Sequence, residues 1–141
     1  MSMTYLYLGM AIVIALIVYF YYFSLRKKKI PRTNSLYTDA LNAMVNGDLS
    51  NAIGLLKQVV KQDSNHVRAY LQLGNILRKE NPEQALKIHQ SLTVRPNLPR
   101  DIQVDIHTAL AEDYGFISNY KKAIEEAKLV LAIEKRNLWA L

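Results

Sequence analysis

The stretches YLQLGNILR, residues 70–78, and QALKIHQSL, residues 84–92, decide the fold class of this chain. In both, apolar residues recur every three or four positions, the spacing that puts them on one face of an α-helix. Asn81 and Pro82 between them are a turn signal, so the two stretches predict a pair of helices. We expect Gly74 and Ala85 at the contact within the pair, because larger side chains there would hold the backbones apart.

The same pattern occurs before and after this pair. Ala85 aligns with Ala52 and Ala123, at spacings of 33 and 38 residues. No stretch from residue 34 onward alternates with the period of two that a strand requires, so the sequence predicts an all-α fold. Turn signals divide this part into six helices. They lie at residues 46–48, 63–65, 80–82, 95–99 and 117–119.

The middle pair resembles the tetratricopeptide repeat, a unit of about 34 residues that reads W-x2-L-G-x2-Y, then A-x3-F, then P. The matching positions are Tyr70, Leu73, Gly74, Leu77, Ala85 and Pro96. The resemblance implies a helical solenoid of about three helix pairs, over residues 34–66, 67–99 and 100–135, with the start of a fourth. Across the repeats, three positions depart from the pattern: Asp39 stands where an apolar residue is expected, and His89 and Ala127 replace the aromatic residue.

The amino-terminal segment has a different character. Residues 1–25 carry no charged side chain. The nineteen residues from Tyr5 to Phe23, as a helix rising about 1.5 Å per residue, would span close to the hydrocarbon thickness of about 30 Å. Positive charge follows this segment instead of preceding it, which predicts an uncleaved transmembrane anchor with the amino terminus outside and the repeats in the cytoplasm.

A basic juxtamembrane linker, residues 26–33, follows the anchor and begins with Arg26, Lys27, Lys28 and Lys29. These four residues either only set the topology or also hold anionic lipid, at about 1 kcal/mol each near the surface. We expect Ile30 to Asn34 to form a break before the first helix of the repeats, because the residue before a proline avoids helical dihedral angles.

Composition excludes several classes of protein. The 141 residues make about one domain. Five of the 18 Lys and Arg lie in residues 26–32, which leaves 13 against 12 Asp and Glu elsewhere. A nucleic-acid binder would carry its basic excess on the folded part, so no nucleic-acid partner is expected. The absence of Cys rules out a disulfide framework, a thiolate metal site and a Cys nucleophile in these residues.

A closer resemblance rests on three short segments: LGNILR at residues 73–78, IHQ at 88–90 and LAEDY at 110–114. Together with the anchor, they resemble the lipopolysaccharide assembly protein B family of membrane-anchored tetratricopeptide proteins. The family's members act as adaptors that associate with an FtsH-type membrane protease and promote turnover of the deacetylase that commits carbon to lipid A. They carry further repeats and a metal knuckle of four Cys, so this sequence is expected to be a fragment or a shortened relative.

The sequence holds no catalytic or metal-binding pattern. His66, His89 and His107 lack the spacing of a metal site, and we expect no metal and no cofactor. We expect His89 to be a packed, hydrogen-bonded core residue. The adjacent carboxylates at 112–113 and 125–126 point about 100° apart on a helix, so they predict solvated side chains and not an acid and base pair. An enzyme is not expected.

One helix face is left for binding. Arg68, Leu71, Asn75 and Arg78 follow one line of the first helix of the middle repeat, away from its packed face. The corresponding positions of the other repeats are Tyr37, Leu41, Met44, Thr108 and Glu112. These residues predict a concave groove, apolar at the membrane end and basic in the middle, that binds proteins or peptides. Alternatively, Arg78 only complements the carboxyl end of its helix.

The resemblance therefore implies an adaptor, anchored in the inner membrane of a bacterium, that regulates lipopolysaccharide biosynthesis by binding partner proteins. Self-association is expected as well. One alternative is a generic tetratricopeptide scaffold for another envelope or secretion complex. The second is a hydrolase that uses His89 or His107.

Overall fold

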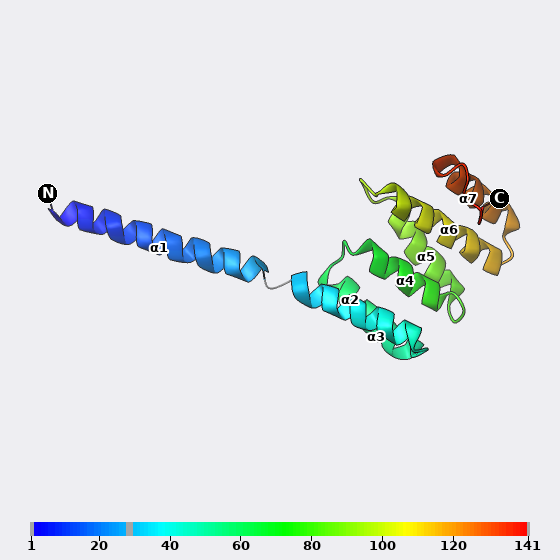
Figure 1. Ribbon diagram of the computed structural model, residues 1–141, viewed down its shortest axis with the longest axis horizontal. Coiled ribbons are helices and arrows are strands. Elements are labelled where there is room, and N and C mark those ends of the chain that lie inside the picture. The colour runs from blue at the N-terminus through cyan, green and yellow to red at the C-terminus, as the bar shows by residue number, and fades with distance from the viewer. Residues whose placement is uncertain (1, 28–29, 141) are drawn as a thin grey trace. The chain divides into compact units, whose positions relative to one another are not determined.

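The computed structural model describes residues 2–27 and 30–140, and within them it contains seven α-helices and no strand (Figure 1). The helices are α1 (Ser2–Lys27), α2 (Ile30–Val45), α3 (Leu49–Gln62), α4 (Val67–Leu77), α5 (Pro82–Thr93), α6 (Arg100–Phe116) and α7 (Tyr120–Ile133). Side chains are described for residues 5, 7–22 and 33–140. The predicted all-α fold is confirmed.

The predicted turns are confirmed as helix boundaries, and polar side chains cap the helices that follow them. Asp48, His66, Asn81 and Asn119 each accept a hydrogen bond from the backbone N–H three residues later. Such a cap satisfies one of the donors that a helix leaves unpaired in its first turn. Gly47 adopts a positive φ of 77°, a conformation that glycine adopts without steric cost.

The expected break at Ile30 to Asn34 is wrong, because helix α2 begins at Ile30. Pro31 therefore lies in the first turn of a helix. A proline is tolerated there because the N–H that it lacks would have no partner within the helix.

The chain divides into two compact units, Met1–Ser35 and Leu36–Leu141. In the first unit, α1 exposes the described apolar side chains along its length, from Tyr5 to Tyr22. Within the part of the chain that the structure describes, no helix is both long and apolar enough to cross a membrane. The predicted transmembrane helix over residues 1–25 is therefore not supported.

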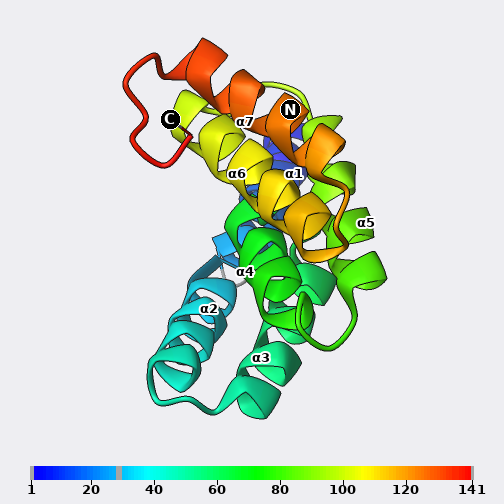
Figure 2. The same ribbon diagram turned by 90° about the vertical axis from the view of Figure 1, so that its right-hand side faces the viewer.

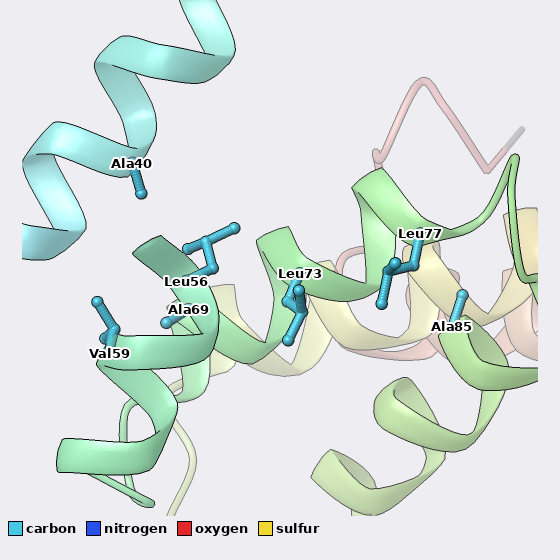
Figure 3. Close-up of a cluster of buried hydrophobic side chains, with 7 residues drawn as sticks. All are labelled: Ala40, Leu56, Val59, Ala69, Leu73, Leu77 and Ala85. Carbon is cyan, nitrogen blue, oxygen red and sulfur yellow. The ribbon is translucent and has the colours of Figure 1, made fainter. Parts of the chain in front are cut away.

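In the second unit, a first hydrophobic cluster joins helices α2 to α5 (Figure 3). Its buried members are Ala40, Leu56, Val59, Ala69, Leu73, Leu77 and Ala85. A second cluster joins α4 and α5 to α6 through Leu71, Leu92, Ile102, Ile106, Ala109, Leu110 and Tyr114. Helix α6 contacts α4, α5 and α7, so the third helix pair stacks on the second (Figure 2).

Helices α4 and α5 approach each other closely at Gly74. A Cβ atom added to Gly74 would lie 2.3 Å from Nε2 of His89 and 2.6 Å from its Cε1. Ala85 is fully buried in the first cluster. Both small residues therefore lie where the sequence predicted, and the ring of His89 fills the space that the missing side chain of Gly74 leaves open.

Candidate functional site

A groove lies between helices α4 and α6. Its cavity has a volume of about 210 Å³, and its lining residues are Leu71, Gln72, Asn75, Asp105, Thr108, Ala109 and Glu112. Because α4 and α6 are the first helices of consecutive pairs, the groove runs across the junction of the second and third repeats. Amide, hydroxyl and carboxylate groups dominate its lining, so the groove can form hydrogen bonds with a polar ligand.

Arg78, beside this groove, is held by four hydrogen bonds. Its Nε donates to Oδ1 of Asp113 at 2.6 Å, and its Nη1 donates to Oε2 of Glu112 at 2.7 Å. Its Nη2 donates to Oδ1 of Asn75 at 2.9 Å and to the carbonyl oxygen of Ala109 at 3.3 Å. Only 15% of the Arg78 side chain is exposed. The guanidinium therefore joins the carboxyl end of α4 to α6.

His89 contacts Asp113, and both side chains are fully buried. Its Nδ1 is 2.5 Å from Oδ2 of Asp113, and its Nε2 is 3.2 Å from the carbonyl oxygen of Leu71. We call Arg78, His89 and Asp113 the buried polar cluster. The expectation that His89 is a packed, hydrogen-bonded core residue is confirmed. The expectation that Asp113 is solvated is wrong.

The groove is not basic in its middle, contrary to the sequence-based expectation. Arg78 is paired with Asp113 and Glu112, and Arg68 is paired with Asp101 at 2.9 Å. Each arginine therefore has carboxylate partners on α6. Sequence reasoning missed this pairing because the partners lie more than 30 residues along the chain.

Asp105 adds a further carboxylate to the groove. Burial raises the pKa of its carboxyl group; Arg68 lowers it, and Asp101 and Glu134 raise it. A carboxyl group with a raised pKa is less stable in its charged form than it would be in water. Asp105 and Glu112 are the two charged residues of the lining, and both are acidic.

The predicted binding residues fall into four groups. Asn75 lines the groove with its side chain half-buried, and Arg78 lies beside it. Leu71 also borders the groove but is only 4% exposed, so it serves mainly as a core residue. Arg68 is exposed in a surface ion pair, a kind of contact worth about 1 kcal/mol or less.

Tyr37 and Leu41 on α2 are half-buried, and neither lines the α4–α6 groove. Tyr37 packs against the first hydrophobic cluster, with its ring centroid 4.6 Å from that of His66. Burial raises the pKa of the Tyr37 hydroxyl, and the positive charge of Arg68 opposes this rise.

The basic run cannot be placed. Arg26 and Lys27 end helix α1, but their side chains lie outside the described ones, and Lys28 and Lys29 lie outside the described residues.

The histidines offer no open catalytic centre. His89 has no exposed surface for a substrate to reach. Nδ1 of His107 is 2.7 Å from Oε2 of Glu126, and both side chains are about one-fifth exposed, so the expectation that Glu126 is solvated is also wrong. Among the described residues, no group of three or more His, Cys, Asp or Glu side chains could hold a metal ion.

Sequence reasoning missed Gln72, Asp105 and Ala109, although it placed Thr108 and Glu112 in the groove. The periodicity of the α-helix could have indicated these three residues. Gln72 lies four residues after Arg68, and Asp105 and Ala109 lie four and eight residues after Asp101, so each shares a helix face with a charged residue near the groove.

No known protein-family model matches the chain. Over 88 residues, the chain is 27% identical to lipopolysaccharide assembly protein B of Escherichia coli strain K12, and the same holds for that protein of Escherichia coli O157:H7. The match covers 62% of this chain, which spans 23% of the length of these relatives.

Among solved structures, the chain is similar to the tetratricopeptide-repeat domain of Arabidopsis OM64. The TM-score is 0.69 at 12% identity, over 79% of this chain and 90% of that domain. It is also similar to MamA of Desulfovibrio magneticus RS-1, with a TM-score of 0.66 at 18% identity, over 81% of this chain and 62% of that one. The chain therefore has the fold of a tetratricopeptide-repeat domain.

Proposed function

We propose that this chain is a non-enzymatic adaptor in lipopolysaccharide assembly, which binds a partner protein in the groove between α4 and α6. One observation carries the proposal: residues from the three segments that resemble the family contact one another in the structure. Residues 73–78, 88–90 and 110–114 supply Arg78, His89 and Asp113, which meet in one buried polar cluster beside the groove. The segments that distinguish this chain from a generic tetratricopeptide repeat therefore supply the residues beside the groove.

The lining of the groove fits an extended segment of polypeptide. Asn75, Gln72 and Thr108 supply side-chain donors and acceptors for peptide groups, and Asp105 supplies a carboxylate. The two charged residues of the lining, Asp105 and Glu112, are both acidic. They favour a partner segment that carries Lys or Arg, because complementary charge speeds association and disfavours acidic competitors. The resemblance to lipopolysaccharide assembly protein B makes an FtsH-type membrane protease the first partner to test.

Crosslinking tests where the partner binds. The chain contains no Cys, so a photo-crosslinker can be attached to a single introduced Cys. In membranes of a bacterial host, Thr108→Cys in the groove should crosslink the partner, and Lys87→Cys on the exposed side of α5 should not. Equal crosslinking from both sites would refute the groove. A groove-specific product from an unrelated envelope or secretion complex would favour the generic scaffold.

We further propose that α1 attaches the repeats to the cytoplasmic face of the bacterial inner membrane. The exposed apolar side chains of α1 and the basic residues that follow it support this location. Leu16→Arg should move the protein from the membrane pellet to the supernatant when a cell lysate is fractionated by centrifugation. Leu129→Arg, which changes an exposed leucine of α7, should not. An unchanged distribution of the Leu16 variant would contradict attachment through α1.

A further inference from the structure

A second pocket lies on a different side of α6 from the groove. Its volume is about 270 Å³, below the range of about 300–1,000 Å³ that is typical of small-molecule sites. Residues 103, 106 and 107 of α6 line it, whereas residues 105, 108, 109 and 112 line the groove, and at 3.6 residues per turn the two sets lie on different sides of the helix. The pocket is therefore separate from the groove and has room for one amino-acid side chain.

The segment between α5 and α6 forms one wall of this pocket and is held in place. Its Pro96 and Pro99 have restricted φ angles. Asn97 adopts a positive φ of 57°, a region that Asn reaches more readily than most residues. Nε2 of Gln103 donates to the carbonyl oxygen of Leu98 at 2.8 Å, which ties the segment to α6. These constraints form the pocket before a ligand binds.

Arg95 gives this pocket a positive charge that has no carboxylate partner among the described residues. Its Nη1 donates to the carbonyl oxygen of Ser64 at 2.8 Å, and its guanidinium carbon lies 4.8 Å from the ring centroid of Tyr70. Both contacts fix the guanidinium, but neither partner carries a negative charge. A guanidinium has five N–H donors, so further donors of Arg95 remain for a ligand.

The lining of this pocket differs in charge from that of the groove. Among the described residues, no Asp or Glu lines the pocket, whereas Asp105 and Glu112 line the groove. Glu126 contacts the lining residue His107, with its Oε2 2.7 Å from Nδ1, but does not itself line the pocket. A carboxylate that enters the pocket therefore meets the positive charge of Arg95 and no acidic lining residue.

The other lining groups suit a carboxylate at the end of an apolar stem. The NH2 group of Gln103 has a second hydrogen besides the one that it donates to Leu98, so it can bind an oxygen together with Arg95. Leu98 and Ile106 supply apolar surface against which CH2 groups can pack. A Glu side chain has both a carboxylate and CH2 groups, while an inorganic anion has only the charge.

We infer that this pocket, which we call the Arg95 pocket, binds an acidic side chain of a polypeptide ligand. The inference does not depend on the proposed function, because the groove and the Arg95 pocket are lined by different residues. The acidic groove favours a segment that carries Lys or Arg, and the Arg95 pocket favours a segment that carries Glu. The chain thus recognises polypeptide segments of opposite charge on two sides of α6.

Nitrogen-15 NMR titration of the full chain in micelles of an uncharged detergent tests the Arg95 pocket. The probe is N-acetyl-glutamate N-methylamide, and the same compound made from glutamine is the neutral control. The glutamate probe should shift the backbone amide signals of residues 95, 97 and 103 in a saturable way. Its dissociation constant should be at least about tenfold lower than that of the glutamine probe, because only the carboxylate accepts charge-assisted hydrogen bonds. Equal binding of the two probes, or inorganic phosphate that binds as tightly as the glutamate probe, would overturn the inference.

Arg95→Gln supplies a matched variant, because it removes the positive charge and keeps a polar side chain. It should raise the dissociation constant of the glutamate probe at least about tenfold. Arg100→Gln removes the same charge from an exposed residue of α6 that does not line the pocket, and it should change this constant less than about twofold. An Arg95→Gln variant that binds the glutamate probe as the wild type does would contradict the inference.

The two experiments can fail separately. If Arg95→Gln does not fold, the comparison of the two probes on the wild type decides alone. Because the probes replace the partner, failure of the crosslinking experiment leaves the Arg95 pocket standing. Failure of the titration, in turn, leaves the groove proposal standing.

Discussion

Replacing Gly74 with alanine should destabilise the chain, although alanine is the better helix former. The new Cβ would lie 2.3, 2.6 and 2.9 Å from three atoms of the His89 ring. This ring cannot withdraw freely, because it is fully buried and hydrogen-bonded at both nitrogens. The methyl group must therefore push the helices apart or break a hydrogen bond of the ring.

The magnitude follows from three opposing effects. Overpacking costs about 1–3 kcal/mol, and a buried group left without its hydrogen bond costs about 1–3 kcal/mol. Against these, Gly→Ala in a helix gains about 1 kcal/mol. The expected net loss in the free energy of unfolding is about 1–5 kcal/mol.

Gly54→Ala is the matched control. Gly54 lies in helix α3, and a Cβ added there meets nothing within 4 Å. This variant should gain roughly 0.5–1 kcal/mol. Urea unfolding followed by circular dichroism would measure both changes. A Gly74→Ala variant as stable as the wild type, alongside a stabilised Gly54→Ala variant, would refute the close approach of α4 and α5.

Three further changes test the packing and the electrostatics. Arg78→Met should lower the free energy of unfolding by about 3–5 kcal/mol, since it leaves the Asp113 carboxylate buried without its cation; a loss below 1 kcal/mol in urea melts would contradict this. Ala85→Leu should cost about 1–3 kcal/mol by overpacking the first cluster, while Lys87→Leu on the exposed side of the same helix should change little; equal melting temperatures would argue against the packing. Asp105→Asn should stabilise the chain at pH 7, because the raised pKa of Asp105 means that its charged form opposes folding, and this gain should vanish as the pH falls below about 4. A gain that persists at pH 3 would have another cause.

The sequence predicted the local structure well, because local signals determine it. Helical spacing and turn residues located the helices after α2, and Asp48 and Asn119 act as caps at the expected turns. The size of Gly74 also indicated a close contact. These features depend on residues that are neighbours in the sequence or that share a helix face.

The groove was harder to predict, because its electrostatics depend on distant pairs. Arg78 and Asp113 are 35 residues apart, and His89 and Asp113 are 24 apart. Adjacent carboxylates on a helix usually indicate a solvated face, so nothing local distinguishes the buried Asp113 from the exposed Glu112. The prediction of a basic groove was wrong for this reason, since it counted the arginines without their acidic partners.

The ion pairs of Arg78 with Asp113 and Glu112 make a charge reversal at Arg78 unsuitable as a test of partner binding. From the sequence alone, Arg78→Glu should weaken partner binding and leave stability unchanged. In the structure, the same change would put a carboxylate beside Asp113 and Glu112, so lost binding could follow from lost folding. Thr108, which lines the groove and lies outside the buried polar cluster, is the better position.

The affinity of the groove for its crosslinked partner is therefore the most direct test of the central claim. Thr108→Trp should fill the groove and raise the dissociation constant at least about tenfold, equivalent to about 1.4 kcal/mol. Lys128→Trp, at an exposed position of α7 away from the groove, should change the dissociation constant less than about twofold. If the two variants bind the partner equally well, with melting temperatures like that of the wild type, the partner does not bind in the groove between α4 and α6.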